Sequence, residues 1–202
     1  MAANYSRYVT KVAAFLVLAT LLLGCEKTES PQRFNATDIT GANFARDFSL
    51  LDQKGQLRTL ADFRGKVVVV FFGYTHCPDF CPTTLSEFRS ISQKLGASAE
   101  EIQFIFVTLD PERDTPPKLE AYLKAFDPKF LGLTGAIDDV STVAKEFKVI
   151  FQRVETSKPD RYSVDHSTGT FVFDKLGRIR LFIPYGKSAE ETLKDLHILL
   201  NE

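Results

Sequence analysis

The sequence predicts an α/β fold, in which a mixed central sheet carries helices on both faces. The first observation behind this prediction is the apolar run KVVVVFFG at residues 66–73, which has the composition of a strand buried on both faces. The second is the order of the segments, a β–α–β start followed later by two strands and a helix. This order is the thioredoxin arrangement, so we expect a thioredoxin-like fold.

The first half of the chain supplies the hairpin, the central strand and the first helix. Two short apolar segments within residues 48–60 flank the turn sequence DQKG, which predicts an N-terminal β-hairpin extension. After the strand at 66–73, an apolar stripe of helical spacing predicts a helix that begins at Pro82 and ends at Gly96.

The second half alternates strands and helices and closes on a hairpin and a helix. Asp138 is the expected N-cap of one helix, and Ser188 with Glu191 forms a capping box for the last. The expected elements are a buried strand at 101–109, a loop at 110–117, a helix at 118–126, a short strand at 130–133, a helix at 138–147, an extended segment at 149–154, a polar turn at 155–161, a hairpin of strands 169–174 and 179–184, and a helix at 188–200.

The N-terminus has the features of a targeting signal. Arg7 and Lys11 precede an apolar stretch at residues 12–23, which is shorter than the about 20 residues that a membrane span needs. The stretch ends in LLGC, which resembles the bacterial lipoprotein box and implies cleavage before Cys25 and lipidation of its thiol. The alternatives are an uncleaved short anchor or a soluble exported protein in which Cys25 is incidental.

The expected organisation is therefore a signal peptide of the lipoprotein type at residues 1–24, a lipid-anchored flexible tether at 25–44 and a folded domain at 45–202. The domain would be exported and tied to a bacterial membrane, in the periplasm or otherwise outside the cytoplasmic membrane. The net charge of −1 argues against a nucleic-acid partner.

The two remaining cysteines, Cys77 and Cys81, follow the central strand with C-x-x-x-C spacing. A disulfide between them would close too short a loop to stabilise a domain of this size, so a redox or metal-binding role is the stronger interpretation. Because each precedes a proline, we expect Cys81 at the N-cap of the helix and Cys77 in the loop before it. The helix end would then lower the pKa of the thiols, and soft thiolates would select Cu(I) or zinc.

Three histidines could add a ligand to the thiols. His197 lies in the last helix and is expected at the surface. His76 is expected to affect the pKa of the neighbouring thiol or to contact a partner protein. His166 directly precedes a strand whose entering loop faces the cysteines in a thioredoxin fold, so it can complete a site of two sulfurs and one nitrogen. The alternative is a loop histidine hydrogen-bonded to Asp165.

Thioredoxin-like oxidoreductases resemble one another in a cis-proline before this strand, where the present chain has Thr168-Gly169-Thr170. A proline ring would crowd an ion at this place. We interpret Gly169 as leaving room for a metal.

Three segments together resemble the Sco/SenC family of copper chaperones: FGYTHCPDFCP at 72–82, LDPERDTP at 109–116 and VDHSTGTFVFD at 164–174. The resemblance implies copper, as Cu(I) or Cu(II), bound by Cys77, Cys81 and His166. It also implies a role in assembling the binuclear copper centre of cytochrome c oxidase, by copper delivery or by reduction of the target's cysteines. The implied partners are the copper-bearing subunit of the oxidase, other copper chaperones and a thioredoxin-like reductant.

Two enzymatic alternatives stay open beside the metallochaperone. In a thiol–disulfide oxidoreductase, Cys77 or Cys81 would attack a disulfide of an exported protein and the other cysteine would resolve it. A thiol peroxidase is the weaker alternative, because Phe71 and Phe72 stand where a proline is expected. The segment from Asp110 to Asp114 is expected to form a turn and to cap the following helix.

Overall fold

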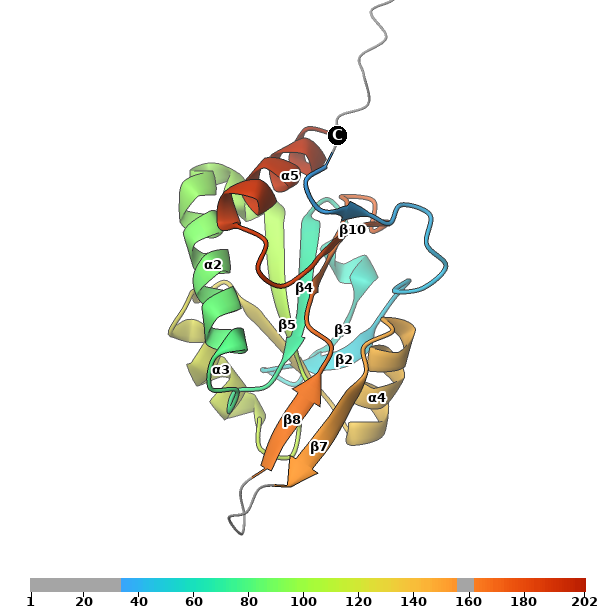
Figure 1. Ribbon diagram of the computed structural model, residues 1–202, viewed down its shortest axis with the longest axis vertical. Helices are drawn as coiled ribbons and strands as arrows, with labels where there is room; N and C mark the ends of the chain where they lie inside the picture. Colours follow the sequence, from blue (N-terminus) through green and yellow to red (C-terminus); the bar gives the residue numbers. More distant parts are fainter. Residues whose placement is uncertain (1–33, 156–161) are drawn as a thin grey trace, which may run out of the picture. The chain divides into compact units, whose positions relative to one another are not determined.

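A central sheet of eight strands organises the part of the chain that this computed structural model describes, residues 34–155 and 162–202 (Figure 1). Its strand order is β1-β10-β9-β4-β5-β6-β2-β3. The strands are β1 (Thr37–Asp38), β2 (Ser49–Asp52), β3 (Leu57–Thr59), β4 (Val67–Gly73), β5 (Ile102–Thr108), β6 (Leu131–Thr134), β9 (Thr170–Phe173) and β10 (Ile179–Ile183). Strands β4, β5 and β6 run parallel, whereas β9 is antiparallel to β4 and β10 to β9. The sheet is mixed, as predicted.

The central strand β4 is buried at all seven of its positions. Successive side chains of a strand point to opposite faces of the sheet. Phe71 accordingly packs edge-on against Phe88 of the first long helix, whereas Phe72 packs against Phe147 on the other face. Burying each of these rings stabilises the fold by about 1.5–3 kcal/mol. The run read from the sequence as a strand covered on both faces is confirmed.

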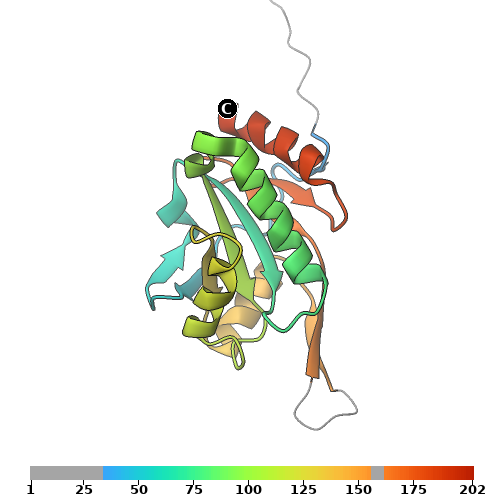
Figure 2. The same cartoon turned by 90° about the vertical axis from the view of Figure 1, so that its left-hand side faces the viewer.

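Helices cover both faces of the sheet, as the two views in Figures 1 and 2 show: α2, α3 and α5 lie on one side and α4 on the other. Among the described residues, no helix is both long and apolar enough to cross a membrane. The helices are α2 (Phe80–Leu95), α3 (Pro116–Lys124), α4 (Ile137–Glu146) and α5 (Ala189–Asn201), with 3-10 turns η1 (Leu60–Phe63) and η2 (Gly96–Glu101).

The predicted helix ends are partly right. Helix α2 ends at Gly96, whose φ of 57° suits glycine, and Ser188 and Glu191 form the predicted capping box of α5. Helix α2, however, begins two residues before Pro82, because a proline is tolerated in a first turn whose N–H groups have no intrahelical partner. Helix α4 begins at Ile137, so Asp138 lies in its first turn and is not its N-cap.

The predicted N-terminal hairpin is confirmed as β2 and β3, and β2 also pairs with β6 at the edge of the sheet. The predicted tether, by contrast, does not extend to residue 44. Strand β1 pairs with β10, and the backbone N–H groups of Asn35 and Ala36 donate to the carboxylate of Asp195 at 2.8 and 2.7 Å. The folded domain therefore begins near Phe34, because a buried carboxylate about 160 positions later binds this segment.

A second, two-stranded sheet extends beyond the main one, at the lower end of Figure 1. Its strands are β7 (Phe151–Glu155) and β8 (Tyr162–His166), with Phe151 opposite His166. The extended segment predicted at 149–154 corresponds to β7, whereas β8 was not predicted. Most of the polar turn predicted at 155–161 lies outside the described residues.

Candidate functional site

Both cysteines of the described domain lie at the carboxyl end of β4, where the chain turns into α2. They are free thiols, and their exposed fractions are 8% for Cys77 and 0% for Cys81. Cys81 is the second residue of α2 and so lies inside its first turn, not at its N-cap as predicted. Its backbone N–H donates to Sγ of Cys77 at 3.5 Å, which places the first thiol against the start of the helix.

Gly73, the last residue of β4, makes room for the second thiol. A Cβ at this position would stand 2.7 Å from Sγ of Cys81 and 3.0 Å from the ring of Phe106. Side chains essentially never approach so closely, so only glycine fits beside Cys81 without a shift of its neighbours. The sequence pattern around the cysteines gave no indication of this role.

The expectation that the helix end lowers both thiol pKa values is wrong for Cys81. Burial raises the pKa of the Cys81 thiol, and the nearby Cys77 sulfur and Asp114 carboxylate add to the increase. Desolvation outweighs the helix dipole because the side chain has no exposed surface. Ionisation of Cys81 therefore needs a compensating positive charge, such as a metal cation would supply.

His166 is the last residue of β8, on the hairpin next to the cysteine loop. Its Nδ1 donates to the carbonyl oxygen of Ser167 at 2.9 Å, so Nε2 has no proton in the neutral ring and keeps a lone pair that suits a metal. The imidazole is therefore bonded to this carbonyl oxygen and not to Asp165, which was the partner in the alternative interpretation. Burial lowers the pKa of His166, which keeps the imidazole neutral and able to bind a metal.

Tyr74 links the cysteine loop to this hairpin. The side chain is buried, and its ring meets the imidazole of His166 edge-on with a centroid distance of 6.2 Å. The fold thus brings Cys77, Cys81 and His166 to one end of the sheet, although the two sulfur atoms and a ring nitrogen of His166 are not all within 4.8 Å of one another.

The buried carboxylate of Asp114 holds the beginning of the cysteine loop. It has no exposed surface, and it accepts hydrogen bonds from the Thr75 N–H at 2.9 Å, the Thr75 hydroxyl at 2.5 Å and the Thr108 hydroxyl at 2.6 Å. Thr115, and not an aspartate, is the N-cap of α3. The predicted turn at 110–114 is present, but its two aspartates bind other side chains and do not cap the helix.

His76, Asp110 and Asp114 place one ligand atom each within 4.8 Å of one another. We do not assign a second metal site to them, because their oxygens already have protein donors. Asp114 binds the two threonines, and Asp110 binds the guanidinium of Arg113 and the hydroxyl of Tyr162. His76 itself is exposed and lies 3.8 Å from Asp114. The third histidine, His197, is exposed on α5 as predicted.

The interpretation of Gly169 as room for an ion is wrong. A Cβ at Gly169 would stand 2.3 Å from the ring of Phe182, so an aromatic side chain fills the space beside this glycine. The residue is needed for the packing of β10 against the start of β9. It gives no separate support to a metal.

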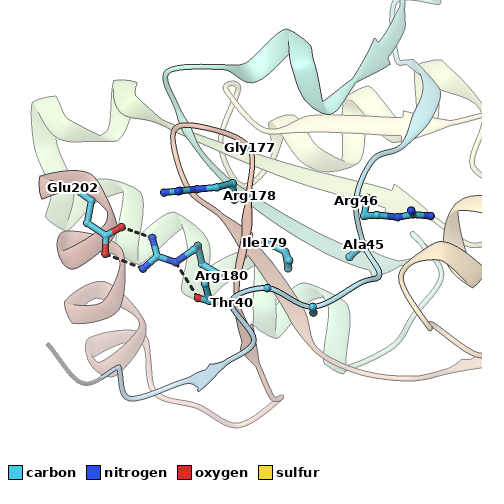
Figure 3. A pocket seen from close by; sticks show the side chains of 10 residues that line it. Thr40, Ala45, Arg46, Gly177, Arg178, Ile179, Arg180 and Glu202 are labelled. Carbon is cyan, nitrogen blue, oxygen red and sulfur yellow. Dashed lines mark hydrogen bonds and ion pairs between the residues drawn. The ribbon is translucent and has the colours of Figure 1, made fainter. Parts of the chain in front are cut away.

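A hollow of about 580 Å³ lies at the other end of β4, between the N-terminal segment and the β9–β10 turn. Figure 3 shows Arg180 paired with Glu202 and with Thr40 across it. Arg178 pairs with Asp174, and Arg46 pairs with Glu146. Each guanidinium that lines the hollow thus has a carboxylate partner, and Cys77, Cys81 and His166 are not among the lining residues.

The fold and site define a class of protein: a thioredoxin-like domain with two thiols after its central strand and a histidine on the neighbouring hairpin. The family model described as SCO1/SenC matches residues 36–201, and the chain belongs to this family.

Curated and solved relatives agree with the family assignment. The SCO2-like protein of Rickettsia prowazekii is 38% identical over 148 residues, which are 73% of this chain and 72% of that protein. A structure of Bradyrhizobium japonicum ScoI with copper bound is 37% identical, covers 76% of this chain and 97% of its own and has a TM-score of 0.70. The solution structure of apo Sco1 from Thermus thermophilus is 38% identical, covers 83% and 97%, and has a TM-score of 0.74.

Proposed function

We propose that this protein is a copper metallochaperone that binds one copper ion through Cys77, Cys81 and His166. The chemistry of the donors supports this assignment, because two thiolates and a neutral imidazole nitrogen suit Cu(I) and Cu(II). The observation that supports the proposal is that two buried free thiols lie at the same end of the sheet as a histidine whose Nδ1 is bonded to a carbonyl oxygen. A relative 37% identical to this chain was solved with copper bound.

The copper ion is cargo in this proposal. The present spacing of the three ligand atoms is wider than a closed metal site requires. An approach of the hairpin and the cysteine loop would close the site on the ion, and the reverse movement would release it to a partner by ligand exchange. Membership of the SCO1/SenC family supports a role in assembling the copper centre of cytochrome c oxidase. The partners would be its copper-bearing subunit, other copper chaperones and a thioredoxin-like reductant.

The test is metal analysis of the reduced protein with titration of copper against a competing chelator. The wild type should bind one equivalent, and His166→Ala should bind about tenfold more weakly or worse while the Cys77–Cys81 disulfide still forms. His197→Ala is the matched control, because it removes an exposed histidine far from the thiols. Equal copper affinity for the wild type and His166→Ala would refute the three-ligand site.

A thiol–disulfide reductase is the second candidate, and one observation favours it. Cys77 accepts the N–H of Cys81 at the start of α2, whereas burial disfavours the thiolate of Cys81. Cys77 would therefore attack a target disulfide, and Cys81 would resolve the mixed disulfide. Reduction of an exported dithiol target at the wild-type rate by His166→Ala would favour this function, and no reduction by the wild-type protein would exclude it.

The attachment to a membrane is also part of the proposal. The lipoprotein box at Cys25 supports export, cleavage after residue 24 and lipidation, with residues 25–33 as the connection to the domain. Expression of the full chain in a bacterium and separation of membranes would test this. The Cys25→Ser protein should be absent from the membrane fraction. If it stays there with an uncleaved leader, the leader itself is the membrane anchor.

A further inference from the structure

Tyr162, at the start of β8, is bound to the acidic loop that follows β5. Its hydroxyl donates to Oδ1 of Asp110 at 2.7 Å, and Nη1 of Arg113 donates to its carbonyl oxygen at 3.0 Å. The guanidinium carbon atoms of Arg113 and Arg153 lie 3.5 and 3.7 Å from the centre of its ring. The hydroxyl, the carbonyl oxygen and the ring of this residue are thus all in contact with charged side chains.

The same loop binds the cysteine side of the site. Asp114 holds both the N–H and the hydroxyl of Thr75, two residues before Cys77. Asp110 and Asp114 are joined by a backbone hydrogen bond of 2.9 Å, so they move as one turn. The turn at residues 110–114 therefore contacts the loop that carries the thiols through Asp114, and it contacts the strand that carries the histidine through Asp110.

The direction of β8 connects Tyr162 to the imidazole. Residues 162, 164 and 166 share one face of the strand because side chains alternate along it. On that face Tyr162 meets the acidic loop, Val164 is 5% exposed and His166 meets the ring of Tyr74. Strand β8 pairs with β7 and, among the described residues, with no strand of the main sheet. The position of the strand therefore depends on the contacts of this face, together with the chain's continuation into β9.

We propose that Tyr162 is a positioning residue for the copper site, which fixes His166 relative to the two thiols through its hydrogen bond to Asp110. The inference deepens the proposed function and rests on it. Loss of the bond would loosen the hairpin, although the contacts of the Tyr162 ring and carbonyl oxygen remain, and His166 would then be available at the ion for a smaller fraction of the time. Cys77 and Cys81, held through Asp114 and α2, would be unaffected.

The test is Tyr162→Phe, which keeps the ring and removes only the hydroxyl. Copper affinity of the reduced full-length protein, measured by competition with a chelator, should fall about tenfold, within the range for lost support of a metal ligand. Tyr185→Phe is the matched control, because this tyrosine is 43% exposed and lies on the connection between β10 and α5. Asp110→Asn removes the charge of the acceptor and should weaken copper binding in the same direction.

A double-mutant cycle separates positioning from general loss of stability. In the His166→Ala background, Tyr162→Phe should cause no further loss of affinity, because the ligand that it positions is gone. The reduction potential of the Cys77–Cys81 pair should stay at the wild-type value. An unchanged affinity in Tyr162→Phe, or an equal loss in both backgrounds, would overturn the inference while the proposed function stands. Failure of the wild type to bind copper would instead overturn the proposed function.

Discussion

Gly73→Ala adds one methyl group at the point where β4 meets the second thiol. The new carbon would lie 2.7 Å from Sγ of Cys81 and 3.0 Å from the ring of Phe106, where ordinary contacts begin at 3.4 Å. The sulfur would have to retreat by roughly 1 Å to restore normal contact. Cys81 is fully buried in the first turn of α2, so this movement must shift the helix or change the rotamer. Overpacking of this kind costs about 1–3 kcal/mol.

The assay compares stability and copper affinity in the same preparations. At about 2–4 °C per kcal/mol for a domain of this size, a loss of about 2 kcal/mol lowers the Tm by about 4–8 °C. Gly55→Ala is the control: its φ of +77° with nothing within 4 Å makes the substitution strained by about 1–2 kcal/mol, far from the thiols. Gly73→Ala should weaken copper binding at least about tenfold, whereas Gly55→Ala should leave the affinity unchanged.

The refuting result is specific. If both glycine variants lose similar stability and keep wild-type copper affinity, the displacement of Cys81 does not matter to the metal. Cys81 would then not be a ligand, or the site would tolerate a movement larger than a metal–sulfur bond allows. If Gly73→Ala loses no stability, the close contact is relieved by a local adjustment, and the argument from packing fails.

Three further outcomes follow from the buried groups. Asp114→Ala should lower the free energy of unfolding by about 3–5 kcal/mol, because it leaves three donors unpaired. Asp79 is exposed, and the control variant Asp79→Ala should change this free energy by less than about 1 kcal/mol. Equal denaturation midpoints for the two variants would contradict the prediction. Asp195→Ala should expose the backbone around residues 34–38 to proteases, because it removes the acceptor of the Asn35 and Ala36 N–H groups, and wild-type cleavage rates there would speak against it. Burial lowers the pKa of His166 below 6.5, so protons compete with copper for the imidazole only below that pH. The ratio of wild-type to His166→Ala copper affinity should therefore be constant near neutral pH and decrease only below pH 6.5. A decrease that begins above pH 6.5 would contradict the lowered pKa.

Local sequence was enough to predict the elements that are defined by their own periodicity. The seven buried residues of β4, the end of α2 at Gly96 and the capping box at Ser188 each depend on neighbours within a few positions. The predicted tether was too long for the opposite reason. Nothing within residues 34–44 indicates that Asp195 lies buried beside them and accepts their N–H groups.

The residues of the candidate site were likewise only partly predictable from the sequence. Residue type and spacing identified the two cysteines and His166 as candidates, because thiols and imidazole near the end of a buried strand are chemically distinctive. The supporting residues were missed: Asp110 and Asp114 were interpreted as turn and capping groups, and Tyr162 was not singled out. Their roles depend on partners 39 and 52 positions away in the chain, and a sequence alone does not pair them.

The sequence by itself determined the fold class, the family and the residue types that can hold copper, because these follow from hydrophobic period, motif and donor chemistry. Tertiary structure decided how those residues behave. It placed Cys81 inside the helix and in a fully buried environment, so that its thiol pKa is raised and not lowered. It also filled the space beside Gly169 with Phe182, and it connected the cysteine loop and the His166 hairpin through one acidic loop. Desolvation and packing depend on every group that surrounds an atom, and those groups come from all parts of the chain.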